Sequence, residues 1–378
     1  MKAAKLWTVL FLVAMAGLPA PLDRVVEAEL EAIDARELEG FLAGLEADLR
    51  PFLPDFREAV KDGARFDPAG LLRNLVLRFG RELAMNAHLL AELVLLATLS
   101  ALLAHLGTAF AAGSLAQLAF YVCYLVMAGL AVNGFMTTIG LGREAVRNLV
   151  DFVYALLPVV SSLLLASGAA TTSALFHPLI LTGAAYVGHL VQTIVFPLAM
   201  LTGVVTLVGH LAEGFSLSRL AGLLRDLTVG LTGAILAAFV GLLTVRGVAA
   251  AAADGVALRA AKYVSGTFVP VVGKGMADAM ETVAGCTLVL KNALGGFGAW
   301  TILVLTAFPL LKILAVVAVY RLAAAFVQPL GAERLGEALH AIGNNLLVVF
   351  AVTALVGLAF LLGLTILVAL GNLAYALR

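Results

Sequence analysis

Charged residues are scarce in this sequence. Of its 378 residues, only 13% are charged and 62% are hydrophobic, and the mean hydropathy is +1.05. A soluble domain carries about 25% charged residues, so the composition excludes that class and predicts an integral membrane protein. The formal net charge is zero, so nothing suggests nucleic-acid binding, which would show as a basic face.

Cysteines are few, and the histidines do not cluster. The two cysteines, Cys123 and Cys286, are too few for a disulfide framework, and Cys123 lies in an apolar run where a small packing residue is expected. His177, His189 and His210 have no carboxylate or cysteine companion to complete a metal site. We therefore expect neither a metal site nor a bound cofactor.

Catalytic motifs are missing as well. The Gly-Lys-Gly at 273–275 departs from the nucleotide-binding loop G-x-x-x-x-G-K-[ST], because Phe268 stands at the first glycine and Gly275 at the Ser/Thr position. The sequence contains neither the zinc-protease motif H-E-x-x-H nor the nucleophile elbow G-x-S-x-G. We therefore expect that the protein is not an enzyme.

The amino terminus has the pattern of a secretory signal peptide. Lys2 and Lys5 precede an apolar run from Leu6 to Val13, and Ala14-Met15-Ala16 follows. This order predicts a signal peptide over residues 1–16, with cleavage after Ala16. An uncleaved anchor is the alternative, and both place the next segment outside the cytoplasm.

Residues 17–87 are predicted to form an extracytoplasmic amphipathic helical region. Half of all charged residues lie between Pro21 and Glu92, among apolar residues that recur at three- and four-residue spacing. Asp67 and Pro68 form a good helix start, and the helix after them carries arginines beside an apolar stripe. That pattern suits a helix on the membrane surface or a helix packed on protein, and both remain open.

Residues 88–378 are predicted to form a polytopic membrane domain. Apolar stretches near the 20 residues that cross a bilayer lie at 88–107, 114–139, 152–168, 227–245, 297–320 and 346–376, and residues 174–212 are long enough for two more. We expect an all-α fold with about seven to nine transmembrane helices, plus re-entrant or amphipathic helices.

Arginine pairs mark three expected connections between these spans: Arg143 with Arg147, Arg219 with Arg225, and Arg321 with Arg334. The positive-inside rule favours the cytoplasm for all three. Strict alternation from an external amino terminus instead puts the first pair outside. The topology therefore stays open at this stage.

One interrupted stretch, residues 246–298, combines charges with helix breakers. Pro270 and Gly273 should end or bend a helix, and the charges near them include Lys274, Asp278, Glu281 and Lys291. Irregular backbone at membrane depth is tolerated only when it is buried in protein or lines water. We therefore predict a pair of short amphipathic helices that is either re-entrant or a plain surface elbow.

Lys312 is a charge inside an apolar span, three residues after Pro309. A lysine at this depth is costly and usually faces the protein interior or water. Snorkelling to the membrane surface and burial against a partner both remain open. For the buried case, Asp278 or Glu281 is the expected partner.

Residues 262–298, KYVSGTFVPVVGKGMADAMETVAGCTLVLKNALGGFG, resemble the stage III sporulation protein AE family of endospore-forming bacteria. The similar elements are F-[IV]-P-V-V-G at 268–273, an acidic residue a few positions later, and L-x-L-K-N-A-x-G at 288–295, which contains Lys291 and Asn292. The expected signal peptide, extracytoplasmic segment and many spans agree with this family in outline.

The resemblance implies a multi-pass protein of the mother-cell membrane, in an assembly that links mother cell and forespore and looks related to specialised secretion systems. It implies oligomers and, as partners, the other proteins of the same operon, including a cytoplasmic secretion-type ATPase and ring-forming membrane proteins, together with the forespore protein SpoIIQ. It carries over no catalytic residue and no cofactor.

From these observations we expect a transmembrane core component of a multiprotein channel, with an export-gate-like role. The 246–298 stretch would line or close the path, and the gate and motif residues would be Pro270, Gly273, Lys274, Asp278, Glu281, Lys291, Asn292 and Lys312. Two alternatives remain: a secondary permease for small solutes, and a passive membrane scaffold in which the acidic region 21–67 recruits partners.

Overall fold

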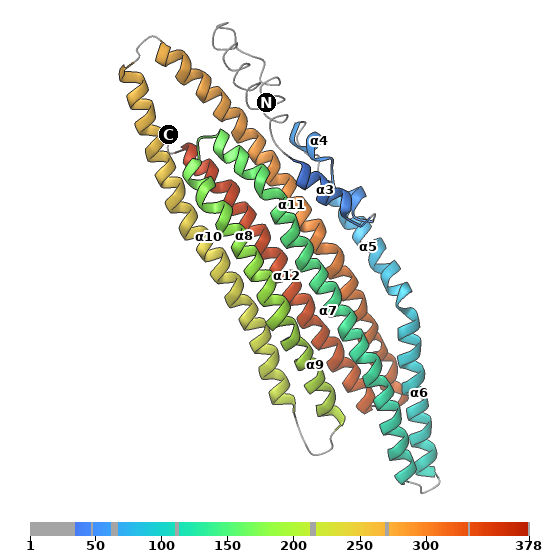
Figure 1. Cartoon of the computed structure of the whole chain (residues 1–378). Coiled ribbons are helices and arrows are strands. Elements are labelled where there is room, and N and C mark those ends of the chain that lie inside the picture. The colour runs from blue at the N-terminus through green and yellow to red at the C-terminus, as the bar shows by residue number, and fades with distance from the viewer. Residues whose placement is uncertain are drawn as a thin grey trace.

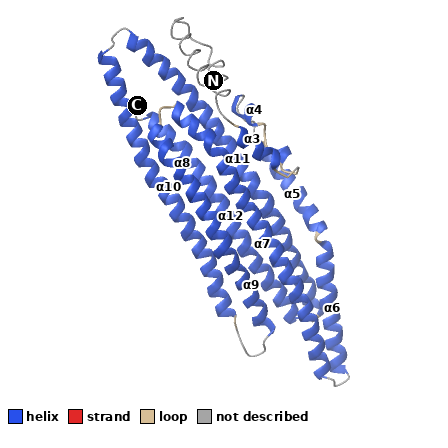
Figure 2. Cartoon of the chain, in the orientation of Figure 1, coloured by secondary structure: helices blue, strands red, loops and turns tan. Residues whose placement is uncertain are grey.

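The computed structural model describes residues 35–46, 48–61, 67–109, 113–211, 217–268, 272–331 and 333–376. Helices account for nearly all of these residues, and no strand occurs among them (Figure 2). The predicted all-α membrane fold is therefore confirmed. The expected signal peptide over residues 1–16 lies outside the described residues.

Short helices precede the membrane bundle. They are α3 (Arg36–Gly44), the 3-10 turn η1 (Arg50–Phe52), α4 (Phe56–Lys61) and α5 (Pro68–Met85), followed by α6 (Ala87–Ala109). The predicted start of α5 is confirmed, because Asp67 Oδ1 accepts a hydrogen bond from the Gly70 N–H at 2.8 Å and Pro68 occupies the first helical position.

The bundle consists of long antiparallel rods (Figure 1). They are α7 (Gly113–Ala166); α8 (Ala170–Leu190), which continues through a π-helical turn η2 (Val191–Val195) into α9 (Phe196–Leu211); α10 (Ser218–Phe268); α11 (Val272–Val327); and α12 (Glu333–Ala376), with the 3-10 turn η3 (Gln328–Leu330) between the last two. Five helical segments are long and apolar enough to cross a membrane, or six if α5 and α6, bent by 45°, form one span.

This number is lower than the seven to nine spans that we expected, because the rods continue beyond single spans. The stretches at 114–139 and 152–168 are parts of α7, and residues 174–211 belong to one continuous rod. Arg143 and Arg147 therefore lie within α7 and not in a connection. Arginine is a good helix former, so a charge pair is weak evidence for a break.

The rods are longer than a bilayer is thick. The shortest single helix among the spans of α7, α10, α11 and α12 has 44 residues, which at 1.5 Å per residue is about 66 Å. A bilayer's hydrocarbon core is about 30 Å thick. The bundle therefore extends beyond the membrane on at least one side.

The interrupted stretch at 246–298 is also more continuous than predicted. Helix α10 runs through to Phe268, and α11 starts at Val272 and continues to Val327, so the expected short amphipathic helices are the ends of two long ones. Figure 1 shows these ends reaching past α8 and α12. Alanine-rich sequence around Asp254 favours helix strongly enough to carry single charges along.

The bundle interior is apolar and closely packed. Small residues allow helices to touch: a Cβ at Gly203 would come within 2.6 Å of the Phe135 ring, and one at Gly142 within 2.8 Å of Phe196. Cys123 is buried in this interior, as expected for a packing residue. A void between α7, α8, α10, α11 and α12 has a volume of about 30 Å³ and is lined by apolar side chains and Gly363.

The N-terminal helices pack on the side of the bundle. Phe41 lies against Phe152 of α7, with ring centroids 5.7 Å apart, and Trp300 of α11 donates from Nε1 to the Phe52 carbonyl at 2.8 Å. For α5, packing on protein accounts for one face, since the Arg78 guanidinium lies 4.8 Å from the Phe308 ring centroid. Its other face leaves large apolar side chains such as Val76 exposed.

Candidate functional site: polar groups at both ends and on one flank

Four of the predicted gate residues lie at the end of the bundle from which α10 and α11 project. Pro270 lies outside the described residues. Gly273, Lys274, Asp278 and Glu281 all fall within the first three turns of α11, and their side chains are not among those that the structure describes. The backbone thus places this charged group on a projecting helix end, and its role as a gate stays a prediction.

Lys312 is far from that group. It belongs to the same continuous helix as Asp278 and Glu281, and 34 residues at 1.5 Å each separate Asp278 from Lys312 by about 51 Å along the axis. The expected pairing within one chain is therefore wrong. The Lys312 Nζ instead lies 3.6 Å from Glu46 Oε2, with the two side chains 30% and 50% exposed, and so ties α11 to the N-terminal helices.

Lys291 is the most unusual polar residue of the family-like motif. Only 1% of its surface is exposed, and its Nζ has no hydrogen-bond partner among the described residues. The next residue, Asn292, accepts a hydrogen bond from Asn372 Nδ2 of α12 at 3.2 Å, and the Asn372 Oδ1 is also buried without a partner. An uncompensated buried amine is costly, so a functional reason for this lysine is a fair hypothesis.

Asp254 of α10 organises the same end of the bundle. Its buried carboxylate accepts the backbone N–H groups of Thr171 and Thr172, each at 2.8 Å, and the Thr172 hydroxyl at 2.6 Å. These groups open α8, and the first N–H groups of a helix have no partner within it. The carboxylate also lies at the positive end of the α8 dipole. Asp254 thus joins α10 to the start of α8.

The predicted site residues did not include Asp254. The sequence carries one signal, which is a single acidic residue in the alanine-rich run AAAAADGVA. That signal indicates that the carboxylate needs hydrogen-bond donors, but it does not identify them. The partner is 82 residues away in sequence.

A polar cleft lies at the opposite end of the bundle, between α9, α11 and α12. Its volume is about 550 Å³, which is within the usual size of ligand sites. The Arg321 guanidinium donates to Asn344 Oδ1 at 2.7 Å inside it. The other polar residues of its lining are His210, Gln328, Glu333, Glu337 and His340. These residues provide hydrogen-bond donors and both signs of charge, so the cleft can bind polar groups.

Sequence reasoning did not find this cleft, because its residues come from three helices that the topology brings together. No group of three or more histidines, cysteines or carboxylates suited to a metal ion occurs among the described residues. Arg321 and Arg334 were interpreted only as markers of a connection. Arg321 lies in α11 and Arg334 at the start of α12, so that expected connection is confirmed.

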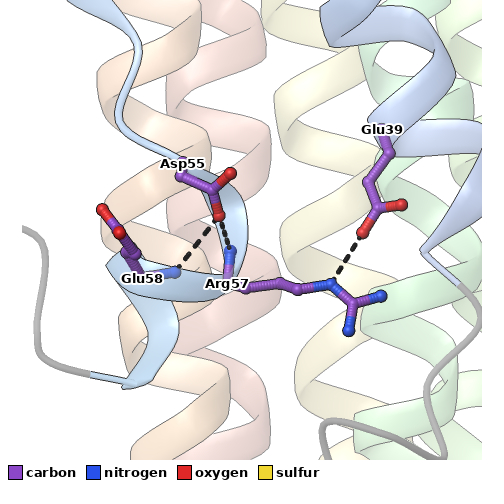
Figure 3. A network of polar contacts seen from close by, with 4 residues as sticks. All are labelled: Glu39, Asp55, Arg57 and Glu58. Atoms are coloured by element: carbon purple, nitrogen blue, oxygen red, sulfur yellow. Dashed lines mark hydrogen bonds and ion pairs between the residues drawn. The ribbon is translucent and has the colours of Figure 1, made fainter.

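Charges also gather along one flank. Arg143, Glu144, Arg147 and Asp151 are all exposed on α7, and we call them the α7 strip. Beside it, the N-terminal helices hold a polar network (Figure 3), in which Arg57 Nε donates to Glu39 Oε1 at 2.9 Å. In the same network, Asp55 Oδ1 accepts the N–H groups of Arg57 at 2.8 Å and Glu58 at 3.3 Å, which caps α4.

Comparison with known proteins supports one family. Residues 53–371 match the family described as Stage III sporulation protein AE. The chain is also 32% identical over 361 residues to the protein named Stage III sporulation protein AE of Bacillus subtilis (strain 168), an alignment that covers 94% of this chain and 90% of that protein. No solved structure matches the chain.

Proposed function

Because the chain belongs to the stage III sporulation protein AE family, we propose that it is a transmembrane core component of a multiprotein sporulation channel, with an export-gate-like role between mother cell and forespore. Membership of the family makes it a sporulation protein, and its apolar helices fit a membrane protein. The channel role, the mother-cell membrane location and the extracytoplasmic amino terminus are parts of the proposal.

The single observation that carries the multiprotein part is the small apolar void between the rods of the described bundle. The central void of about 30 Å³ is lined only by apolar side chains such as Leu156, Phe239 and Phe360. It has room for about one water molecule and offers that water no polar partner. A polar solute would find neither room nor a polar partner in this void, which supports a path formed between chains and not within one.

The same observation speaks against the permease alternative. Secondary transporters bind substrate near mid-membrane, where broken helices present backbone groups to it. Among the described residues, the irregular turn at mid-length, Val191–Val195, is a π-helical continuation of a rod, and Val191 and Val195 are buried. The polar cleft beside Arg321 lies at an end of the bundle instead.

The scaffold alternative depends on the acidic region 21–67 being available to recruit partners. Part of that region is packed on α7 and α11 through Phe41, Phe52 and Phe56, which leaves less of it free. The backbones of α10 and α11 project past α8 and α12 (Figure 1), and we assign partner docking to these ends. The proposed partners are the other proteins of the operon, including the secretion-type ATPase and the ring-forming membrane proteins, and SpoIIQ in the forespore.

The test replaces the charges of the projecting helix end in a sporulating host that lacks its own family member. We expect Lys274→Met, Asp278→Asn and Glu281→Gln together to lower spore yield and co-purification of the partner membrane proteins, with the protein still in the membrane fraction. Lys312→Met is the matched control, because Lys312 is partly exposed and far along the same helix. Normal sporulation and co-purification of the triple variant would refute the proposed role of the helix end.

A further inference from the structure

The α7 strip is level with a stretch of α10 that has no charged residue and the length of a bilayer crossing. Tyr154 donates to the Leu181 carbonyl at 3.2 Å, and a Cβ at Gly188 would contact Val150, so this part of α7 is level with residues 181–188 of α8. A Cβ at Gly183 would in turn contact Phe239. The α7 strip is therefore level with the part of α10 that lies near Phe239 and before it in sequence.

That part of α10 carries no charge. Residues 227–245 contain no Asp, Glu, Lys or Arg, and their length matches one bilayer crossing. Large apolar side chains, including Leu227, Leu242 and Val245, are exposed along them. This face of the bundle is suited to lipid, so the opposite flank at the same depth would also meet lipid in a solitary chain.

Lipid tails cannot solvate the charged side chains on this flank of α7. Four charged side chains within nine residues face outwards there, and charges at this depth occur where they face water, protein or each other. The N-terminal helices extend the polar surface. Phe41 contacts Phe152 next to the strip, and the side chains of Glu39 and Arg57, which pair with each other, are both exposed.

We propose that the α7 strip lines a water-filled path formed between copies of this chain in the assembled complex. This inference rests on the proposed channel function and names the wall of its path. The strip has two positive and two negative residues, so identical copies that face one another meet no net repulsion. A strongly charged partner would instead require a strip of one sign.

The position of the strip also accounts for the conflict between Arg143 and the positive-inside rule. That rule applies to residues in loops beside the membrane. Arginines within a helix at hydrocarbon depth are outside its scope, and a water-filled path gives them a reason to be there. With Arg143 and Arg147 set aside, the other two arginine pairs agree with the positive-inside rule.

The test measures water access by single cysteines in the full chain, with Cys123 and Cys286 replaced by serine and the other complex proteins present. One set replaces each residue of the α7 strip. The matched set replaces Leu227, Val229, Ala234 and Ala237, which are exposed on α10 at comparable depth. An impermeant methanethiosulfonate is applied from each side of the membrane, because the reactive thiolate forms only in water.

We expect strip positions to be labelled at least about tenfold faster than the α10 positions. Equal rates in the two sets, or an unreactive strip, would overturn the inference. Treatment of the Arg147→Cys variant with a series of bis-methanethiosulfonate cross-linkers long enough to span the path should also give a linked species of twice the chain mass, because a direct disulfide would need Cα atoms within about 7 Å. Labelling without that species would overturn the assignment of the wall to copies of this chain.

Failure of the inference and failure of the proposed function give different results. Co-purification of the partner proteins is measured in the same membranes. An inaccessible strip with partners still bound overturns the inference alone, whereas loss of partner binding by the unmodified chain overturns the multiprotein function. Four strip positions give four independent variants, and because all are exposed, none removes a core contact.

Discussion

The Asp254 carboxylate should hold α10 and the start of α8 together. Replacing it tests how much these contacts contribute to the free energy of unfolding. In Asp254→Ala, the N–H groups of Thr171 and Thr172 and the Thr172 hydroxyl lose their acceptor in a buried place. Hydrogen bonds to a charged group contribute about 1.5–3 kcal/mol each, but bonds to one carboxylate are not additive. Removing one side of a buried charged contact typically costs about 3–5 kcal/mol, and we expect a loss in that range.

Asp254→Asn separates shape from charge. The amide oxygen can keep both bonds to Thr172, while the amide nitrogen then faces the Thr171 N–H and cannot accept from it. We therefore expect an intermediate loss of about 2 kcal/mol. Thr172→Val, which removes only the hydroxyl bond, should cost about 1 kcal/mol.

The measurement is the free energy of unfolding of the purified chain in mixed micelles, titrated with sodium dodecyl sulfate and followed by circular dichroism. Asp226→Asn is the control, because Asp226 is an exposed aspartate on the same helix and surface changes usually stay within about 0.5 kcal/mol. If Asp254→Ala costs less than about 1 kcal/mol, or no more than the control, the clamp reasoning is refuted.

Other contacts give further predictions for the same unfolding measurement. Lys291→Met should stabilise the protein by about 1–3 kcal/mol, because it keeps the stem and removes a buried amine that has no partner in the described part of the chain; a loss of stability would show that the amine has a partner. A double-mutant cycle of Lys312→Met with Glu46→Gln should give a coupling below about 1 kcal/mol, since both side chains are partly exposed; stronger coupling would contradict the observed geometry. Gly203→Ala should cost about 1–3 kcal/mol by crowding a ring. Gly222→Ala, with open space around it, should instead gain about 0.5–1 kcal/mol, and equal effects of the two would refute the packing argument.

The sequence predicted those features that depend on neighbouring residues. Hydropathy predicted the membrane class, and helix periodicity predicted the all-α fold. Asp67 and Pro68 predicted the start of α5, since a cap depends only on the next three residues. The motif around Lys291 and Asn292 was enough to indicate the family that the comparisons support.

The number of spans was predicted less well. A window of 20 residues recognises a crossing but cannot tell whether the helix goes on beyond it. Arg143 and Arg147 looked like a connection because charges often lie outside the membrane. In α7 they continue a helix instead, which the packing of Val146, Leu149 and Phe152 into the bundle stabilises.

By itself, the sequence determined the class of the protein, its helical content and the start of α5, because hydropathy, periodicity and capping are local properties of the chain. Tertiary structure alone decided that Lys312 pairs with Glu46 and that Asp254 binds the start of α8. It also decided that the residues around Arg321 form a cleft at one end of the bundle. Each of these contacts joins residues that are distant in sequence. Which helices become neighbours depends on how the whole set of apolar faces and small residues packs together, and no single segment carries that information.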